Sequence, residues 1–533
     1  METSRRVLLK GGLVAAGATF LPGMTGPPID LRPSAAAQTP LENPFSLGVA
    51  SGDPSPDGFV LWTRLARLPL DDDGLGGMGQ SVREVRWQVA TDPRFRRVVR
   101  RGVVATGPDQ GYSVHLEPSG LEPDREHWYR FRLGRHLSPV GRTRTAPRAA
   151  SSPSALSVAF ASCAQWEHGY FTAYRRMAED EPDLVLHLGD YLYEYDPGFE
   201  PARSGNVRHH EGPETVTLAD YRRRHAQYKT DPDLQLLHAT APWVAVFDDH
   251  ELTDNWADDS PGPSTVSGAF DQRRAAALRA YWENMPLRRS AYPQGPRMTA
   301  HRRFGWGGLA TFHMLDTRQY RDPQACGDDG GAMGTCEETW DPARSILGAT
   351  QEAWLAEGMR TSSATWDLLG QQVPFGRLEL GPVAIGRLSM DTWDGYPSCR
   401  DRVLAAMRDA ANPVVLTGDV HDAFATEVWS DHEDPDSVAV PELICTSVTS
   451  NGDGEDSPDG SYKWARTNPQ VKFWNDLRGY VSLRLTGEEL TADFRSLPYV
   501  REGGAPAFTR ASFAVEAGSP RLHQTAALPL AEL

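Results

Sequence analysis

The 533-residue sequence predicts a layered α/β domain with a buried sheet, preceded by a small all-β sandwich. Three observations lead to this fold class. Short segments in which apolar and polar residues alternate, separated by turn residues, fill the region from Asn43 to about Arg148. Apolar runs that alternate with helical segments follow this region. An Ala- and Ser-rich stretch, residues 147–153, stands between the two and is typical of a linker.

Residues 1–37 are predicted to be an export signal. Arg5 and Arg6 precede an apolar run from Gly11 to about Phe20, and residues 34–37 form a small-residue cleavage pattern. The run is too short for a membrane span, and no later stretch reaches about 18 apolar residues, so we expect no transmembrane segment in the mature chain. The paired arginines resemble the twin-arginine signal, and the alternative is an ordinary secretory signal that contains Arg-Arg. We therefore expect the twin-arginine export machinery as a partner and a periplasmic or secreted location.

Residues 38–150 are expected to form the β-sandwich. Period-two alternation marks residues 85–90, 112–116 and 128–133 as strands. Asp53-Pro54, residues 118–120 and Pro123-Asp124 supply turns between strands. Strands of this length at this spacing are typical of a sandwich of roughly 100 residues.

Residues 151–533 are expected to form the α/β domain. Apolar runs predict buried strands at residues 156–161, 184–188, 243–247, 309–315, 366–369 and 413–416. Helical segments at about 170–179, 218–229 and 272–284 lie between several of these runs. Asp231 before Pro232 is typical of a helix N-cap followed by proline at the first helical position. Strands that alternate with helices indicate a layered α/β domain.

Carboxylates, imidazoles, a phenol and a thiol follow five of the predicted strands. These residues include Cys163, Asp190, Tyr193, Asp249, His250, Asn255, Asp316, Asp419 and His421. In α/β sheets the ligand site lies beyond the carboxyl ends of the strands. So many carboxylates at one edge would repel one another, and shared cations are the natural remedy. The pattern predicts a metal site.

Each of these residues also has a plainer interpretation. An Asp after a strand is a common turn or N-cap residue, and Cys163 could be a small buried hydrophobe. Tyr191, Tyr193 and Tyr195 could form the alternating face of a strand. The sequence places His187 in the core and the pair His209-His210 in a solvated loop. The coincidence across all the strand ends favours a site over these separate interpretations.

Composition narrows the function classes. Hydrophobic content of 40% and charged content of 23% are normal for a soluble globular enzyme. The net charge of −17 opposes a nucleic-acid scaffold role, but it suits a protein that collects divalent cations. Among the five cysteines, Cys326 and Cys336 lie ten residues apart in a Gly- and Asp-rich loop. They are the candidate disulfide, which export would permit.

The strand-end blocks carry a family resemblance. Gly189-Asp190-Tyr191, Asp249-His250-Glu251 and Gly418-Asp419-Val420-His421 resemble the signature blocks of the metallophosphoesterase superfamily. Most of that superfamily has Asp-x-His in the first block and Gly-His-x-His in the last, whereas this chain has Ser162-Cys163 and Gly418-Asp419-Val420-His421. These departures, with residues 315–320, 369–372 and 391–396, make the chain similar to the PhoD-type alkaline phosphatase and phosphodiesterase family. The resemblance implies an αββα metallophosphoesterase-like domain behind a fibronectin type III-like sandwich.

The resemblance also implies a site with one Fe³⁺ and two Ca²⁺. By position, Cys163, Asp190 and Tyr193 resemble the iron ligands, with Asp190 bridging to calcium. The remaining metal ligands would be Asp249, Asn255, Asp419 and His421. Hard oxygen ligands suit Ca²⁺, while thiolate and phenolate are reasonable for ferric iron. His250 is expected to orient or protonate a phosphate oxygen, and Asp190 and Asp249 to share in catalysis.

The expected function is that of an exported alkaline phosphatase or phosphodiesterase, acting as a monomer. A metal-activated hydroxide would attack a phosphate monoester or diester in line. Gly-x-Ser-x-Gly is absent from the sequence, so a serine-hydrolase mechanism finds no support. Two alternatives remain: a phospholipase D-type phosphodiesterase of the same family, and a non-catalytic protein that binds cell-wall polymer. The intact acidic blocks at every strand end oppose the second.

Overall fold

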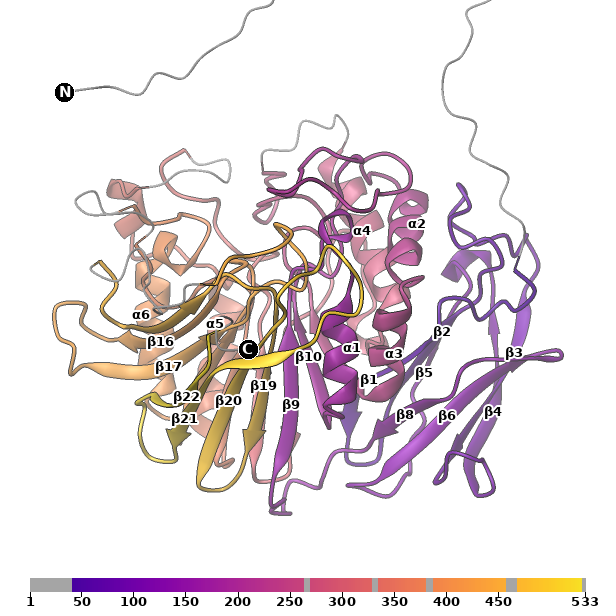
Figure 1. The fold of residues 1–533 in the computed structure, drawn as a ribbon, viewed down its shortest axis with the longest axis horizontal. Coiled ribbons are helices and arrows are strands. Elements are labelled where there is room, and N and C mark those ends of the chain that lie inside the picture. Colours follow the sequence, from indigo (N-terminus) through magenta and orange to yellow (C-terminus); the bar gives the residue numbers. More distant parts are fainter. Residues whose placement is uncertain (1–40, 263–268, 328–333, 380–386, 457–466, 530–533) are drawn as a thin grey trace, which may run out of the picture. The chain divides into compact units, whose positions relative to one another are not determined.

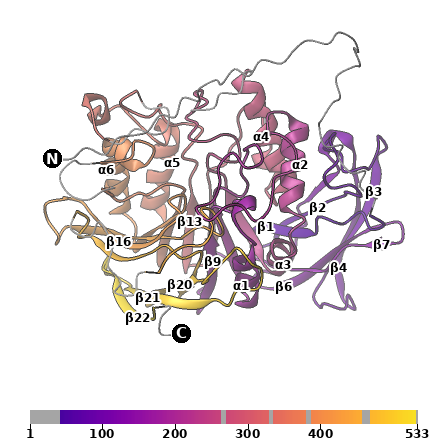
Figure 2. The same cartoon turned by 45° about the horizontal axis from the view of Figure 1, so that its top comes forward.

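The structure is a computed structural model, and it describes residues 41–262, 269–327, 334–379, 387–456 and 467–529. The export signal predicted for residues 1–37 lies outside these residues. Within them, two large β-sheets lie face to face, and helices cover the outer faces (Figure 1, Figure 2). The predicted layered α/β fold is confirmed.

The larger sheet has ten strands within the described residues, in the order β22-β21-β20-β19-β9-β10-β11-β1-β2-β5. Their bounds are β1 Val49–Ser55, β2 Gly58–Arg64, β5 Ser113–Leu116, β9 Leu156–Ala161, β10 Leu184–Leu188, β11 Pro242–Val246, β19 Gly479–Leu485, β20 Glu489–Ser496, β21 Phe508–Glu516 and β22 His523–Ala527. The three central strands β9, β10 and β11 are parallel neighbours, so their carboxyl ends meet at one edge. These three are the first three apolar runs of the predicted α/β domain.

The second sheet has seven strands in the same part of the chain, in the order β12-β13-β14-β15-β17-β16-β18. Their bounds are β12 Arg302–Trp306, β13 Ala310–Met314, β14 Trp366–Gly370, β15 Pro413–Thr417, β16 Ala423–Trp429, β17 Val438–Ile444 and β18 Val471–Asn475. The strands β13, β14 and β15 are parallel and are the other three predicted runs. The strands β16 to β22 were not among the predicted elements.

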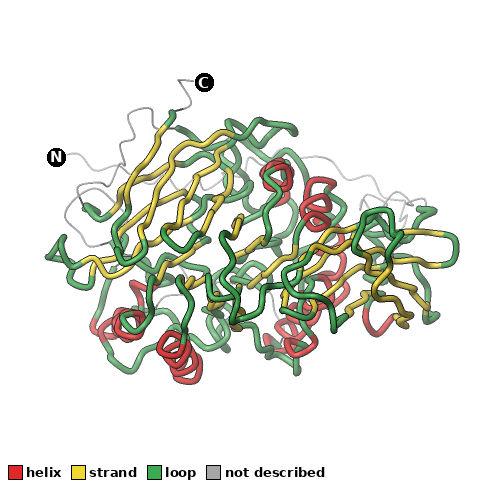
Figure 3. Tube along the Cα trace, turned by 90° about the horizontal axis from the view of Figure 1, so that it is seen from below, coloured by secondary structure: helices red, strands yellow, loops and turns green. Residues whose placement is uncertain are grey.

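Three apolar layers hold the sheets and helices together. Between the sheets, Phe160 and Leu186 pack in one core with Phe312, Leu368 and Leu416. Four helices cover the outer face of the larger sheet: α1 Thr172–Glu179, α2 Leu218–Tyr228, α3 Pro232–Thr240 and α4 Phe270–Asn284. Two helices, α5 Gly348–Thr361 and α6 Pro397–Met407, cover the smaller sheet. Figure 3 shows these helices gathered in two separate groups on the layered strands.

Helix starts follow the local chemistry of the sequence. Asp231 caps α3, because its side chain accepts hydrogen bonds from the backbone N–H groups of Asp233 and Leu234, and Pro232 follows it as predicted. Short 3-10 helices complete the described helical elements: η1 Pro108–Gln110, η2 Trp166–His168, η3 Arg289–Ala291, η4 Glu337–Trp340 and η5 Trp393–Gly395. None of the helices in the described part of the chain has both the length and the apolar character needed to cross a membrane.

The N-terminal region is a sandwich that shares a sheet with the α/β region. A five-stranded sheet contains β3 Arg83–Ala90, β4 Val98–Thr106, β6 Glu126–Leu133, β7 His136–Leu137 and β8 Gly141–Arg144. It faces β1, β2 and β5 across a core that includes Phe59, Val85, Val114 and Phe131. Because β1 pairs in parallel with β11, main-chain hydrogen bonds run from the sandwich into the large sheet. Figure 1 shows the N-terminal strands β1 and β2 in indigo.

Asp53-Pro54, predicted as a turn, lies inside β1 instead. The register of β1 against β2 shifts between Gly52 and Ser55, which marks a β-bulge, and Asp53 has a φ of 41°. A Cβ on Gly52 would lie 2.6 Å from the carbonyl oxygen of Trp243, so only glycine allows this approach to β11. The residues that predict a turn therefore form a bulge in β1, the strand that joins the sandwich to the α/β region.

The cysteines divide as predicted. Cys326 and Cys336 form a disulfide. Cys163, Cys399 and Cys445 are free thiols, and all three are buried.

Candidate metal centre

Candidate ligands follow four strands with identical spacing. The strands β9, β10, β11 and β15 end at Ala161, Leu188, Val246 and Thr417. Two residues beyond these ends stand Cys163, Asp190, Asp248 and Asp419. Three of these strands belong to the larger sheet and one to the smaller. The ligands therefore converge from both sheets at the edge where the strand ends meet, as expected for α/β folds.

The backbone at this edge adopts an unusual conformation. A non-glycine residue with positive φ costs about 1–2 kcal/mol, and such residues gather at functional sites. Five predicted ligands have this conformation: Cys163 (61°), Asp190 (53°), Asn255 (52°), Asp419 (66°) and His421 (66°). Residues with a left-handed backbone conformation therefore gather in the loops that follow these strands.

Four carboxylates form the centre of the site. Asp190, Asp248, Asp249 and Asp419 each offer an oxygen, and these atoms lie within 4.8 Å of one another. Asp190 Oδ1, Asp248 Oδ2 and Asp249 Oδ1 are buried and accept no hydrogen bond in the described structure. A buried acceptor without a partner costs about 1–3 kcal/mol, and more when it is charged. The donor set fits a hard cation, which would satisfy all three oxygens at once.

The pKa values of two carboxyl groups in the cluster, those of Asp190 and Asp419, are raised, which also indicates that the cluster lacks a compensating positive charge. Burial raises the pKa of Asp190 well above its usual value; Asp249 and Asp248 raise it further, and His250 lowers it. Burial also raises the pKa of Asp419 well above its usual value, and the nearby Asp248 adds to the effect. A cation would stabilise the charged forms of these carboxylates in place of protons.

A thiol and a phenol stand beside the carboxylates. Cys163, Asp190 and His421 offer ligand atoms within 4.8 Å of one another. The Tyr193 hydroxyl lies 3.2 Å from Asp190 Oδ2, 3.2 Å from His421 Nε2 and 2.7 Å from Ser450 Oγ. Tyr193 is 1% exposed and lies in a loop after β10, so it is not part of an alternating strand face. This arrangement fits a metal that accepts thiolate and phenolate ligands.

His250 lies against the same cluster, grouped with Asp190 and Asp249. Its Nδ1 donates a hydrogen bond to Glu194 Oε2 at 2.9 Å, and its ring stacks on Tyr193 with centroids 4.1 Å apart. Burial alone would lower the pKa of His250, but Tyr195 and the carboxylates of Asp249, Glu194 and Asp190 hold it well above its usual value. With Nδ1 engaged, Nε2 is the atom that His250 can offer to the site.

Glu251 joins two of the strand-end loops. Its carboxylate accepts hydrogen bonds from the backbone N–H groups of Asp190 (3.1 Å), Tyr191 (2.7 Å) and Asp248 (2.9 Å). This one side chain therefore fixes the loop after β10 against the loop after β11. The sequence Asp249-His250-Glu251 alone does not indicate this bridging role.

Arg318 contacts the carboxylates next to it through ion pairs. Its Nε lies 2.5 Å from Asp248 Oδ1, and its two terminal nitrogens contact both oxygens of Asp391 at 2.8 and 3.0 Å. Asp391 also accepts hydrogen bonds from Arg321 (2.6 Å) and Gln324 (2.8 Å). Arg318 thus orients Asp248 so that its second oxygen remains available. Arg318 and Asp391 lie in the segments that carried the family resemblance, but the sequence assigned them no role.

The structure brings seven of the predicted residues together at this centre: Cys163, Asp190, Tyr193, Asp249, His250, Asp419 and His421. Asn255 joins it through its backbone N–H, which donates to Asp249 Oδ2 at 2.7 Å. Asp248 is a member that the sequence did not propose, although it stands next to Asp249. Asp316 lies outside the cluster, where its carboxylate accepts hydrogen bonds from the backbone N–H groups of Arg318 (3.1 Å) and Gln319 (3.0 Å).

Two histidine predictions have different outcomes. His187 is a core histidine as predicted, because it is fully buried, bonds the Tyr174 hydroxyl at 2.9 Å and stacks on Trp243. The solvated loop predicted for His209-His210 is wrong for His210. That side chain is buried, and its Nε2 lies 3.1 Å from the Tyr228 hydroxyl. Adjacent loop residues with opposite exposure give no periodic signal in a sequence.

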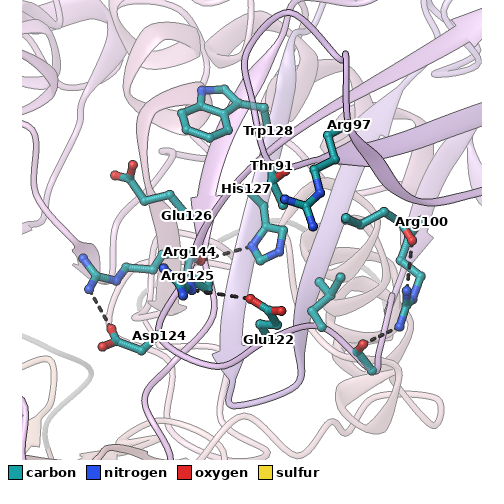
Figure 4. Close-up of a pocket in the computed structure, with 13 residues that line it drawn as sticks. Thr91, Arg97, Arg100, Glu122, Asp124, Arg125, Glu126, His127, Trp128 and Arg144 are labelled. Carbon is teal, nitrogen blue, oxygen red and sulfur yellow. Dashed lines mark hydrogen bonds and ion pairs between the residues drawn. The ribbon is translucent and has the colours of Figure 1, made fainter.

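A separate cavity of about 930 Å³ lies in the N-terminal sandwich. Figure 4 shows its lining, in which Arg144 pairs with Asp124 at 2.6 Å and His127 bonds the Arg125 carbonyl oxygen at 3.1 Å. All its lining residues fall between Thr91 and Arg144, and none belongs to the carboxylate cluster. Arg144 pairs with Asp124 and Arg125 with Glu122, and among the described residues this lining offers no cluster of converging carboxylates, so the candidate site is the strand-end cluster and not this cavity.

Comparisons with known proteins find a family and relatives that this chain resembles. The family model for PhoD-like phosphatase matches residues 158–494, and the model for the PhoD-like phosphatase N-terminal domain matches residues 32–147. The chain is 47% identical over 473 residues to alkaline phosphatase D of Bacillus subtilis (strain 168), covering 88% of this chain and 80% of that protein. It also superimposes on a solved structure of PhoD with a TM-score of 0.88 and 45% identity, covering 92% of this chain and 94% of the other.

Proposed function

Since this chain belongs to the PhoD-like phosphatase family and is a phosphoric ester hydrolase, we propose that it is exported and that it holds one Fe³⁺ and two Ca²⁺. One observation carries the metal proposal. Three buried carboxylate oxygens, from Asp190, Asp248 and Asp249, accept no hydrogen bond and belong to one cluster of converging ligands. Hydrogen-bonded turn or cap residues would not leave these atoms without a hydrogen bond, and Arg318 reaches only Asp249 Oδ1, at 3.7 Å.

The proposed ligands divide by their chemistry. Cys163, Tyr193 and Asp190 would hold Fe³⁺, with Asp190 also reaching a calcium ion. The oxygen-rich side of the cluster, formed by Asp248, Asp249 and Asp419, would hold Ca²⁺. Asn255 and His421 would complete the set of metal ligands. When bound, the metals would supply positive charge that activates water and stabilises phosphate oxygens in the transition state.

His250 would act as the proton donor in this reaction. Glu194 fixes its ring through Nδ1, and stacking on Tyr193 holds the ring plane beside the carboxylates. Nε2 can then donate a proton to a phosphate or leaving-group oxygen. Glu251 and Arg318 would keep Asp190 and Asp248 in place. No side chain needs to act as a nucleophile, and the family assignment removes the non-catalytic alternative.

Rates on two substrates test this proposal. Hydrolysis of a phosphate monoester and a phosphate diester should be measured with and without added calcium. We expect turnover of at least one of them to depend on calcium. The ratio of the two rates decides between phosphatase and phosphodiesterase action, and a diester with a lipid headgroup tests the phospholipase D alternative. Turnover of neither class by metal-loaded protein would contradict the proposed function.

Tyr193→Phe tests the iron ligand set. A phenolate bound to ferric iron should give the protein a visible absorption band, so the variant should shift or weaken this band and lower activity together. Tyr174→Phe is a matched control, because it also removes a buried hydroxyl that bonds a histidine. The control should leave the band unchanged. Colourless, fully active wild-type protein without iron in elemental analysis would remove iron from the proposal and leave calcium.

Replacing both Arg5 and Arg6 by lysine tests the export route. The twin-arginine pathway reads this pair, so the double variant should remain in the cytoplasm. The measurement is the share of phosphatase activity in the periplasmic or extracellular fraction. Arg32→Lys makes the same chemical change outside the pair and should be exported normally. Normal export of the double variant would point to the general secretory route.

A further inference from the structure

Four aromatic rings lead from the metal centre to the protein surface. Tyr193 stacks on His250 with ring centroids 4.1 Å apart, and Tyr195 meets His250 edge-on at 5.2 Å. Phe199 follows at 5.2 Å from Tyr195. We call Tyr195 and Phe199 the aromatic platform. The ring contacts connect this platform directly to His250, which lies beside the carboxylates.

Exposure increases along this series of rings. Tyr193 is 1% exposed, His250 is 8% exposed, Tyr195 is half-buried and Phe199 is 71% exposed. A single exposed aromatic residue is ordinary on a protein surface. Phe199 differs because it is the outer end of a continuous series of rings that begins at the proposed catalytic histidine. A bound molecule that extends outward from His250 would meet the platform.

The segment that carries the platform is fixed by buried groups. Arg224 donates a hydrogen bond to the carbonyl oxygen of Tyr195 at 3.0 Å. Three residues later, the backbone N–H of Gly198 donates to the two oxygens of Glu167 at 3.1 and 2.9 Å, and Glu167 is fully buried. Phe199 N–H then closes a turn onto the Asp196 carbonyl oxygen at 3.1 Å. The main chain is held while the Phe199 ring remains exposed, which is the arrangement expected of a preorganised contact surface.

From this geometry we propose that Tyr195 and Phe199 bind the leaving group of the substrate and favour a planar, aromatic one. This inference rests on the proposed phosphoesterase function and adds a substrate class to it. With phosphorus at the carboxylate cluster and the leaving-group oxygen at His250, the rest of the leaving group extends over Tyr195 towards Phe199. Aromatic rings pair in offset or edge-to-face arrangements with centroids 4.5–7 Å apart, so a ring bound there would continue the same series. An alkyl leaving group would gain less from this contact.

Substitution of Phe199 tests the platform on phenyl phosphate and ethyl phosphate. Phe199→Ala should lower kcat/KM for phenyl phosphate about three- to tenfold, as expected for loss of one aromatic pair. The value for ethyl phosphate should change less than about twofold on the same reasoning. Phe199→Trp should restore the preference. Trp340→Ala removes an aromatic side chain that is 55% exposed on η4, and it should alter neither rate.

A second measurement separates this inference from the proposed function. The Kd values of phenylphosphonate and methylphosphonate, measured calorimetrically on metal-loaded protein, report the contact without turnover. Phe199→Ala should raise the Kd of phenylphosphonate by the same factor of about three to ten and leave the Kd of methylphosphonate unchanged. Equal changes for the aryl and alkyl compounds, or no change for either, would overturn the platform. Wild-type protein that hydrolyses neither ester would overturn the proposed function, while the phosphonate affinities would still decide on the platform.

Discussion

Replacing Asp190 by asparagine is expected to lower kcat/KM for phosphate esters on the order of a thousandfold, beyond the 10–100-fold typical of groups that only support a metal ligand. Asp190 belongs to every ligand group found within the described residues. Its Oδ1 accepts no hydrogen bond, and its Oδ2 lies 3.2 Å from the Tyr193 hydroxyl. An amide keeps the size of the side chain but loses the charge, so it would weaken both proposed metal sites together. Steady-state kinetics and metal content measure the effect.

Asp316→Asn is the matched control for this variant. Asp316 is also a buried aspartate two residues beyond a strand, because β13 ends at Met314. Its Oδ1 accepts two backbone N–H groups, and an asparagine oxygen can still accept both. Its Oδ2 accepts from Gln319 Nε2, and the variant loses this one hydrogen bond outside the cluster. We expect at most a small loss of activity and normal metal content. Equal losses for the two variants would show that the metal centre lies elsewhere.

Removing calcium with a chelator is expected to abolish hydrolysis and to destabilise the fold. The reason is the same set of buried carboxylates, which would then repel one another or bind protons. An ion held at a hundred times its Kd contributes about 2.7 kcal/mol to the free energy of unfolding. The midpoint temperature of thermal unfolding and the activity should therefore both decrease on chelation, and both should recover when calcium is restored.

Magnesium and the Asp190 variant provide controls for the chelation experiment. Mg²⁺ demands a compact octahedral geometry and should restore less activity than Ca²⁺. In Asp190→Asn, which already lacks one cluster charge, chelation should cause a smaller loss of stability than in the wild type. Full activity after exhaustive chelation would remove calcium from the mechanism.

The strands that position the site could be predicted from the sequence because they are buried on both faces. Such strands form continuous apolar runs, and β9, β10 and β11 were each located to within one residue. The residues after them were therefore assigned to one edge, and the structure does bring Cys163 and Asp190 together there. Their roles as metal ligands remain predictions.

The groups that support the cluster could not be predicted in this way. Asp248 and Asp249 are adjacent, and only the turn after β11 decides that both carboxylates enter the cluster. Arg318 contacts Asp248 although the two residues are 70 positions apart in the sequence, and no local pattern predicts such a contact. The sharing of one sheet by the sandwich and the α/β region depends on a bulge at Gly52 and Asp53, which in the sequence was indistinguishable from a turn.

The pairing of β9 with β19 has a consequence for how the chain reaches its native state. On one side β9 pairs with β10, whose first residue, Leu184, lies 28 residues after Leu156, the first residue of β9. On the other side β9 pairs with residues 481–485. The strand that leads to Cys163 therefore remains a sheet edge until the C-terminal part of the chain has been synthesised. Contacts of such long separation close slowly, and an exposed edge strand invites aggregation in the meantime. We therefore expect this edge of the sheet to be completed only after residues 481–485 have been synthesised, and a chaperone that covers the edge would protect the nascent chain until then.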